Sequence, residues 1–147
     1  MDTSNYDALL LGNQLCFPLY ACSREIIKRY KPFLDELDLT YTQYITLMVL
    51  WEHQSATVKE LGQKLHLDSG TLTPLLKKME AKGLLTRKRC EQDERSLLVT
   101  LTDKGAALRE QAMDIPGKMA GCVNLSQEES TALYNTLYNL LGQLGEE

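Results

Sequence analysis

Hydrophobic positions in the middle of the chain recur with the period of two short amphipathic helices. Val58, Leu61 and Leu65 would form the buried edge of the first, and a capping box of Thr57 with Glu60 predicts where it begins. The second helix would bury the side chains at the i, i+3, i+4 and i+7 positions of one face, namely Leu72, Leu75, Leu76 and Met79. Two short helices in immediate succession indicate a helix-turn-helix.

The second helix has several candidate capping residues. Asp68, Ser69 or Thr71 could accept a hydrogen bond from its first turn. Pro74 favours a late start, because proline is accommodated without strain only in the first turn of a helix. We therefore expect this helix to begin late in the segment.

A β-hairpin is predicted directly after the second helix. Gly83 stands where a glycine commonly ends a helix. Residues 84–90 and 96–101 have the pattern of two strands, and the polar residues 91–95 between them would form the turn. Segment 57–102 is therefore predicted to be a winged helix-turn-helix, which is a DNA-binding unit.

The N-terminal part of the chain predicts two further helices. Residues 13–31 carry a wide apolar stripe, and Pro18 inside it predicts either a kink or a helix that begins late. Pro32 is expected to end this helix. A capping box at Thr40 then begins a helix that is apolar on nearly all sides, which is typical of a helix at the centre of a domain.

The C-terminal part predicts a helix capped by Thr102 that runs to Ala120, with an interruption or kink at Pro116. A capping box of Ser126 with Glu129 begins a last, leucine-rich helix. The apolar residues at the two ends of the chain exceed what a small central core can cover. This surplus favours packing of the ends on a second subunit, so we expect a homodimer.

The predicted fold class is mainly α with a small β-hairpin wing. Residues 1–147 would form a single domain. Within it, 57–102 is the expected DNA-binding lobe, and 8–32 together with 103–147 the expected dimerisation lobe, in which N- and C-terminal helices mediate dimerisation.

Charge is distributed unevenly along the chain. The formal net charge is −4, yet residues 57–95 carry nine basic and six acidic side chains. A basic segment on an acidic protein suits a polyanion bound to one face. A solvated charged face is the alternative interpretation if charge alone is considered.

The outward positions of the second helix combine hydroxyls near its start with cations one turn later. Hydroxyls bind base edges or phosphates, and lysines neutralise phosphates. These positions are Ser69, Thr71, Thr73, Pro74, Lys77 and Lys78. The hairpin adds Arg87 on a strand and Arg95 near the tip, where it could enter a narrow minor groove while Asp93 holds its guanidinium.

Other classes of protein are less well supported. The N-terminus has no signal-peptide pattern and no apolar run approaches the ~18 residues that span a bilayer, so we expect a cytoplasmic protein without a membrane partner. The four cysteines are then expected to be reduced thiols. His53, His66 and the cysteines lack metal-ligand spacing, so neither a metal nor a cofactor is expected.

The run LDSGTLTPLLKKMEAKGLLTRKRCEQDERSLLVTLTDKG resembles the winged helix-turn-helix of the MarR (multiple antibiotic resistance regulator) family of bacterial transcription factors. Asp93-x-Arg95 followed by Leu101-Thr102 matches the wing signature of that family. The N-terminal run NQLCFPLYACSREIIKRYKPFLDELDLTYTQYITLMVLWEH is similar to the peroxide-sensing branch, the organic hydroperoxide resistance regulators. The resemblance extends from about Leu11 to Gly142.

The resemblance implies a dimeric repressor with interlocking terminal helices and one sensing cysteine, which corresponds to Cys16. Two tyrosines of the partner subunit would hydrogen-bond its sulfur, and these correspond to Tyr30 and Tyr41. On the recognition helix and wing, the matching DNA-contact positions are Ser69, Thr71, Lys78, Asp93 and Arg95.

The branch has one-cysteine members, whose oxidised thiol is capped by a small thiol, and two-cysteine members, which form a disulfide between subunits. Cys122 matches the second pattern, so the resemblance implies a disulfide between Cys16 and Cys122 of the other subunit. Without the resemblance, a cysteine on an apolar stripe is more often an inert core residue.

The expected function is therefore a redox switch and not an enzyme: reduced protein binds operator DNA, and oxidation of Cys16 by an organic hydroperoxide releases it. Two alternatives stay open. A phenolic ligand in the cleft between the two lobes could release the DNA instead. A thiol peroxidase would use the same cysteine but leaves the basic wing without a role.

Overall fold

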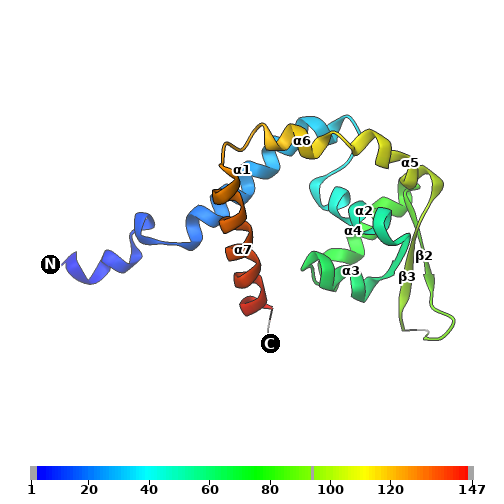
Figure 1. Cartoon of the computed structure of the whole chain (residues 1–147). Helices are drawn as coiled ribbons and strands as arrows, with labels where there is room; N and C mark the ends of the chain where they lie inside the picture. Colours follow the sequence, from blue (N-terminus) through cyan, green and yellow to red (C-terminus); the bar gives the residue numbers. More distant parts are fainter. Residues whose placement is uncertain (1–2, 94, 146–147) are drawn as a thin grey trace.

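The computed structural model describes residues 3–93 and 95–145; Glu94, in the predicted hairpin turn, lies outside the described residues. The protein is mainly helical with a small antiparallel sheet, as predicted (Figure 1). In chain order the elements are η1 (Thr3–Leu9), η2 (Leu11–Asn13), α1 (Cys16–Asp35), α2 (Tyr41–His53), β1 (Ser55–Thr57), α3 (Val58–Leu65), α4 (Ser69–Ala81), β2 (Leu85–Arg89), β3 (Leu97–Leu101), α5 (Asp103–Ala112), α6 (Ile115–Ala120) and α7 (Gln127–Leu144).

Figure 1 shows how these elements are arranged. Helices α2, α3 and α4 and the sheet form one lobe, with the β2–β3 hairpin projecting from its side as a wing. Helices α5 and α6 lead from this lobe back along α1, and α7 descends from the other end of α1. The two 3-10 helices extend the N-terminus away from the lobe as an arm.

The sheet has the strand order β1-β3-β2, and both pairs are antiparallel. Val99 of the central strand pairs with Ala56 on one side and with Arg87 on the other. Strand β1 is not predicted by the sequence, because a three-residue strand is too short to show alternation. It forms because the linker between α2 and α3 lies along the edge of the hairpin.

The core lies in this lobe, around the helix predicted to be central. Leu47 and Leu50 of α2, Leu61 of α3 and Leu76 of α4 are almost completely buried, together with Val99 of the sheet. Local capping sets the helix starts at the predicted residues: the hydroxyls of Thr40, Thr57, Thr102 and Ser126 each accept a hydrogen bond from the backbone amide three residues later.

Helix α4 begins at Ser69, so the prediction of a late start is wrong. Asp68 caps the helix by accepting a hydrogen bond from the Thr71 amide at 2.7 Å. Pro74 consequently lies inside the helix, where its missing N–H leaves the Gly70 carbonyl without the usual i+4 donor. The cap and the burial of the apolar face outweigh that loss.

Helix α1 also continues through a proline. Pro18 stands in its first turn, which agrees with the late start that was one of two predicted alternatives. Pro32 does not end the helix as predicted, because α1 runs on to Asp35. The last turn is held by Leu34, which is buried in the core, and by an ion pair of Lys31 with Asp35 at 2.9 Å.

The C-terminal region differs from the prediction in one place. The expected helix after Thr102 is interrupted at 113–114, slightly before Pro116, and Pro116 occupies the first turn of α6 instead of marking the break. Gly83 ends α4 as predicted, with a positive φ of 78° that glycine adopts without strain.

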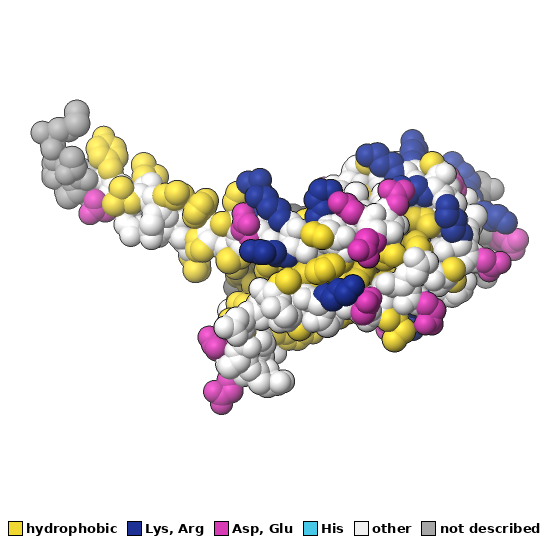
Figure 2. Space-filling view, turned by 90° about the horizontal axis from the view of Figure 1, so that it is seen from above, with side chains coloured by type: hydrophobic (Ala, Val, Ile, Leu, Met, Phe, Trp, Pro, Cys, Tyr) yellow, Lys and Arg dark blue, Asp and Glu magenta, His cyan; other side chains and the backbone are white. Residues whose placement is uncertain are grey.

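The terminal helices expose their apolar residues. Helix α7 has no buried residue, and Leu34 is the only buried residue of α1. Figure 2 shows hydrophobic side chains exposed along the N-terminal arm, to which Leu9, Leu10 and Leu11 belong. Within the described residues, no helix is both long and apolar enough to cross a membrane.

Candidate functional site

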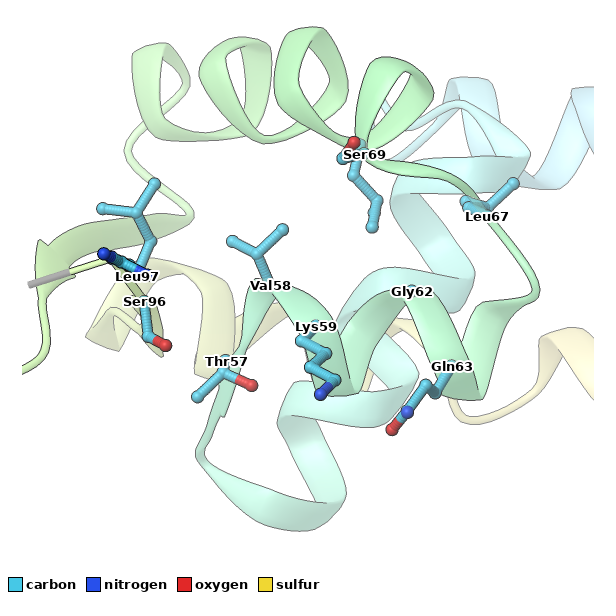
Figure 3. A pocket seen from close by; sticks show the side chains of 11 residues that line it. Thr57, Val58, Lys59, Gly62, Gln63, Leu67, Ser69, Ser96 and Leu97 are labelled. Atoms are coloured by element: carbon cyan, nitrogen blue, oxygen red, sulfur yellow. The ribbon is translucent and has the colours of Figure 1, made fainter. Parts of the chain in front are cut away.

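A groove of about 690 Å³ separates the helix-turn-helix from the wing. Figure 3 shows that its labelled side chains come from the end of β1, from α3 and the turn after it, from the start of α4, and from the start of β3 with the residue before it. The lining includes the cation Lys59 and the amide Gln63 of α3, Ser69 of α4, and Arg95 with Ser96 of the wing. These polar side chains stand among apolar ones, which include Val58 and Leu97. The cations, hydroxyls and amide suit the phosphate backbone of DNA.

The exposed face of α4 is the predicted one. Ser69, Thr71, Thr73, Pro74, Lys77 and Lys78 are all exposed, whereas Leu72, Leu75, Leu76 and Met79 are buried. The hydrogen bond from the Thr71 amide lowers the pKa of the Asp68 carboxyl, so the cap is anionic at neutral pH. The helix therefore presents hydroxyls in its first turns and cations further along.

Asp93 organises the wing turn in a different way from the prediction. Its carboxylate accepts hydrogen bonds from the Arg95 backbone amide (3.0 Å) and from the Ser96 hydroxyl (3.1 Å). The sequence-based expectation was a bond to the Arg95 guanidinium. The backbone amide two residues on is the nearer donor for an aspartate in a turn, and the guanidinium is left for the groove.

Arg87 hydrogen-bonds to another residue of the protein. Its guanidinium donates to Glu80 of α4 at 3.0 Å, and its backbone amide donates to the other carboxylate oxygen, also at 3.0 Å. Arg87 also lowers the pKa of the Glu80 carboxyl. This pair of hydrogen bonds joins β2, the first strand of the wing, to the recognition helix α4. Sequence reasoning placed Arg87 among the DNA contacts and missed Glu80, because neither residue belongs to a local motif.

Lys59, Gln63 and Lys82 are further residues that sequence reasoning did not single out. The spacing of Lys59 and Gln63 on the exposed face of α3, opposite Leu61, was the available signal. Lys82, at the end of α4, donates to the Asp38 carbonyl and to the side chain of Gln43 (3.0 Å). Gln43 is the buried partner in the Thr40 capping box, so the end of α4 is tied to the corner between α1 and α2.

The tyrosines of the candidate thiol site lie together at this corner. The ring centroids of Tyr30 and Tyr41 are 4.9 Å apart, and the Tyr44 ring lies 5.9 Å from that of Tyr30. Burial raises the pKa of all three phenols, and at Tyr30 the neighbouring Tyr41 adds to the rise. The hydroxyls therefore stay protonated at neutral pH and are hydrogen-bond donors.

Cys16 is exposed and is the first residue of α1. Tyr30 is fourteen residues further along the same helix, a rise of about 21 Å. One chain therefore does not bring its own Cys16 and Tyr30 together. Cys122 is also exposed and lies two residues after the end of α6, where its amide donates a hydrogen bond to the Met119 carbonyl (2.9 Å).

A second, apolar groove of about 460 Å³ runs between α1 and α7. Leu15, just before α1, and Leu19 and Ile26 of α1 line it on one side, and Leu133 and Leu137 of α7 line it on the other. Cys22 and Tyr41 also border it, so one member of the tyrosine pair stands at the edge of this apolar groove. In the described part of the chain, no cluster of three or more His, Cys, Asp or Glu side chains could hold a metal ion.

Comparison with known proteins agrees with this geometry. The family model of the SarA/Rot transcriptional regulators matches residues 28–111. The organic hydroperoxide resistance transcriptional regulator of Bacillus subtilis (strain 168) is 55% identical over 141 residues, which cover 96% of each chain.

Among solved structures, reduced AbfR bound to DNA is similar with a TM-score of 0.77 and 35% identity, over 97% of this chain and 99% of that chain. AbfR, a protein of Staphylococcus epidermidis, also matches in its disulfide form, with a TM-score of 0.66 and 33% identity over 99% and 100% of the two chains. This chain therefore belongs to the MarR family of winged helix-turn-helix transcriptional regulators, in the branch of the organic hydroperoxide resistance regulators.

Proposed function

We propose that this protein is a thiol-based redox-sensing repressor, which binds operator DNA when reduced and releases it when an organic hydroperoxide oxidises Cys16. The observation that carries the proposal is the separation, along α1, of the exposed Cys16 thiol from Tyr30, whose ring lies beside that of Tyr41. In a dimer, the tyrosines of one subunit can lie beside the Cys16 thiol of the other, which the tyrosines of the same chain cannot do.

The sensing unit is accordingly a homodimer. The exposed apolar residues of the arm, of α1 and of α7 supply the surface for a second copy. A two-fold dimer places its two α4 helices in major grooves about 34–36 Å apart, and its operator is pseudo-palindromic. The repressor acts in the cytoplasm, where bacterial DNA lies.

In the DNA complex, α4 and the wing have different tasks. Ser69, Thr71 and Thr73 face base edges in the major groove, while Lys77 and Lys78 bind phosphates. Arg95, which Asp93 positions through the backbone, reaches the minor groove. Arg87 supports this arrangement from within the protein through Glu80.

The tyrosine hydroxyls of the partner donate hydrogen bonds that favour the Cys16 thiolate. The thiolate attacks the terminal oxygen of the hydroperoxide; an S–O bond forms, the O–O bond breaks, and the departing alkoxide takes up a proton from water, which balances the proton that the thiol released on ionising. Sulfur is oxidised to a sulfenic acid as the peroxide is reduced. The thiolate of the partner's Cys122 then attacks this sulfur, which forms the disulfide and releases water. AbfR, with its solved disulfide form, supports this second step.

The decisive experiment is a DNA-binding titration of the reduced and the cumene-hydroperoxide-treated protein. We expect oxidation to weaken binding by at least about tenfold, within the usual range of allosteric coupling. Cys16→Ser keeps its affinity after treatment, whereas Cys90→Ser, a matched control on the wing, responds like the wild type. Release of DNA from Cys16→Ser by hydroperoxide would contradict the assignment of the sensor.

Non-reducing gel electrophoresis tests the disulfide separately. Treated wild type should migrate as a covalent dimer, and Cys122→Ser as a monomer. If Cys122→Ser still gives the covalent dimer, another cysteine resolves Cys16. Consumption of many equivalents of hydroperoxide per subunit would favour a thiol peroxidase, whereas the switch consumes about one equivalent per oxidised thiol.

A phenolic ligand is the second candidate effector. A groove of about 380 Å³ between α2 and α5–α6 is lined by Tyr44, Met48, Trp51 and Met113, with Arg109 as its cation. The carboxylate of Glu52 also lines this groove, and Arg109 donates to the Trp51 carbonyl at 3.4 Å. The aromatic and thioether walls suit an aromatic ring, and Arg109 is the group that would bind the carboxylate of a ligand such as salicylate. Release of DNA from Cys16→Ser by salicylate would favour this candidate, and no response to salicylate would exclude it.

A further inference from the structure

Pro74 has an unusual place in α4. It lies inside a thirteen-residue helix with its ring exposed, and it takes one hydrogen bond out of the helix. Proline is the least favourable residue in a helix interior. Its ring is exposed and makes no buried contact, and the residue lies at neither end of the helix. A residue that breaks a local rule on an exposed face points to a functional contact made by its ring.

Thr73 next to it has its hydroxyl occupied. The hydroxyl donates to the Ser69 carbonyl one turn earlier, at 2.8 Å. This bond turns the oxygen back against the helix, so the methyl group is the part of the side chain left for a partner. Leu72 and Leu75 on either side of the pair are buried, which fixes Thr73 and Pro74 on the outer face.

The two residues therefore form a small apolar patch among polar neighbours. Ser69 and Thr71 lie in the turn before the patch, and Lys77 and Lys78 in the turn after it. In a helix-turn-helix the early residues of the second helix face the base edges. The patch is thus placed between side chains that bind bases and side chains that bind phosphates.

We propose that the Thr73 methyl group and the Pro74 ring read the C5-methyl group of a thymine in each operator half-site. That methyl group is the apolar feature that bases display in the major groove, and it distinguishes A·T from G·C pairs. The inference rests on the proposed function only in placing DNA against α4. It does not depend on the peroxide chemistry.

The test uses reduced protein and a 30-base-pair duplex enriched with it from a random library. Each half-site thymine is replaced in turn by deoxyuridine, which removes the methyl group and keeps the base pair. At one or two positions per half-site we expect the wild type to bind about fourfold more weakly, from about 0.8 kcal/mol per buried methyl-sized group. Pro74→Ala and Thr73→Ser should bind the thymine and deoxyuridine duplexes more nearly equally.

Two further variants separate this role from a structural one. Thr73→Val keeps the methyl group and replaces the hydroxyl with a second methyl group, so it should retain the preference for thymine. Pro74→Ala restores the helical hydrogen bond, so its melting temperature should rise even as the preference falls. A loss of thymine preference in Pro74→Ala is then not the result of unfolding.

Three outcomes would overturn the inference. In the first, the wild type binds the deoxyuridine duplexes as tightly as the thymine duplex. In the second, both Pro74→Ala and Thr73→Ser keep the full wild-type preference, which would mean that other residues contact the thymine methyl group. Failure of the reduced protein to enrich any duplex would defeat the proposed DNA-binding function and this inference together. The first two outcomes leave the proposed function intact.

Discussion

Lys82 ties the end of the recognition helix to the corner that carries the tyrosine pair, and replacing it tests this connection. Its ammonium group donates to the Asp38 carbonyl at 2.5 Å and to the Gln43 side-chain oxygen at 3.0 Å. The Asp38 carboxylate, at 3.7 Å, is almost fully exposed and adds little. Lys82→Met keeps the apolar stem and removes the charge with both hydrogen bonds.

The expected cost follows from those two bonds. Hydrogen bonds to a charged donor contribute about 1.5–3 kcal/mol each when well shielded. The Lys82 side chain is 31% exposed, so water replaces part of the interaction. Gln43 keeps its bond from the Thr40 amide and is not left without a partner. We therefore expect a loss of about 2 kcal/mol in the free energy of unfolding, or about 4–8 °C in Tm for a chain of this size.

The assay is thermal unfolding of the reduced protein by circular dichroism, with all variants at one concentration because Tm of a dimer depends on concentration. Lys28→Met is the matched control, because its pair with Glu25 at 3.2 Å is exposed on both sides and should contribute at most about 1 kcal/mol. Equal shifts for Lys82→Met and Lys28→Met would refute the connection between α4 and the α1–α2 corner.

Three other predictions follow from single features. Gly105→Ala should destabilise the protein by about 1–3 kcal/mol in urea unfolding, because its Cβ would press on the Leu84 backbone carbonyl; an unchanged midpoint would contradict this. Lys78→Ala should weaken binding to all sequences and reduce the slope of log Kd against the logarithm of the salt concentration by about one, and an unchanged slope in titrations at several salt concentrations would exclude a phosphate contact by Lys78. Hydrogen bonds lower the pKa of Asp68, Glu80 and Asp114 in the folded protein. The stability that these carboxylates contribute is therefore complete at a pH above their pKa in the unfolded chain. It is lost as the pH falls through their lower pKa in the folded protein, below about pH 4. Melting curves from pH 6 to pH 3 measure this decline, and Glu80→Gln should flatten it.

The predictable part of the fold is the part that local physics determines. Capping hydroxyls such as Thr40 and Ser126 and the period of Leu72, Leu75 and Leu76 define helices without knowledge of the rest of the chain. The predictions made from Pro32 and Pro74 were wrong, because burial of neighbouring leucines stabilises both helices enough for them to include a proline. Strand β1 could not be predicted, because its formation depends on a partner more than forty residues away.

The candidate site divides in the same way. Helical periodicity was sufficient to place Thr71, Thr73 and Lys78 on the outer face of α4. The Arg87–Glu80 ion pair joins a strand to a helix, and no sequence pattern within either element indicates that these two residues are partners. The thiol site came from a family resemblance, since nothing in the spacing of one cysteine and two tyrosines predicts that the rings lie 4.9 Å apart.

The distance along α1 between Cys16 and Tyr30 has a genetic consequence. In the proposed dimer, each sensing site takes its sulfur from one subunit and its phenols from the other. A subunit with Cys16→Ser and a subunit with Tyr30→Phe and Tyr41→Phe are each defective as homodimers, but their heterodimer contains one complete site. Two defective alleles expressed in the same cell would then complement each other, as alleles of a protein with a self-contained site in each chain do not.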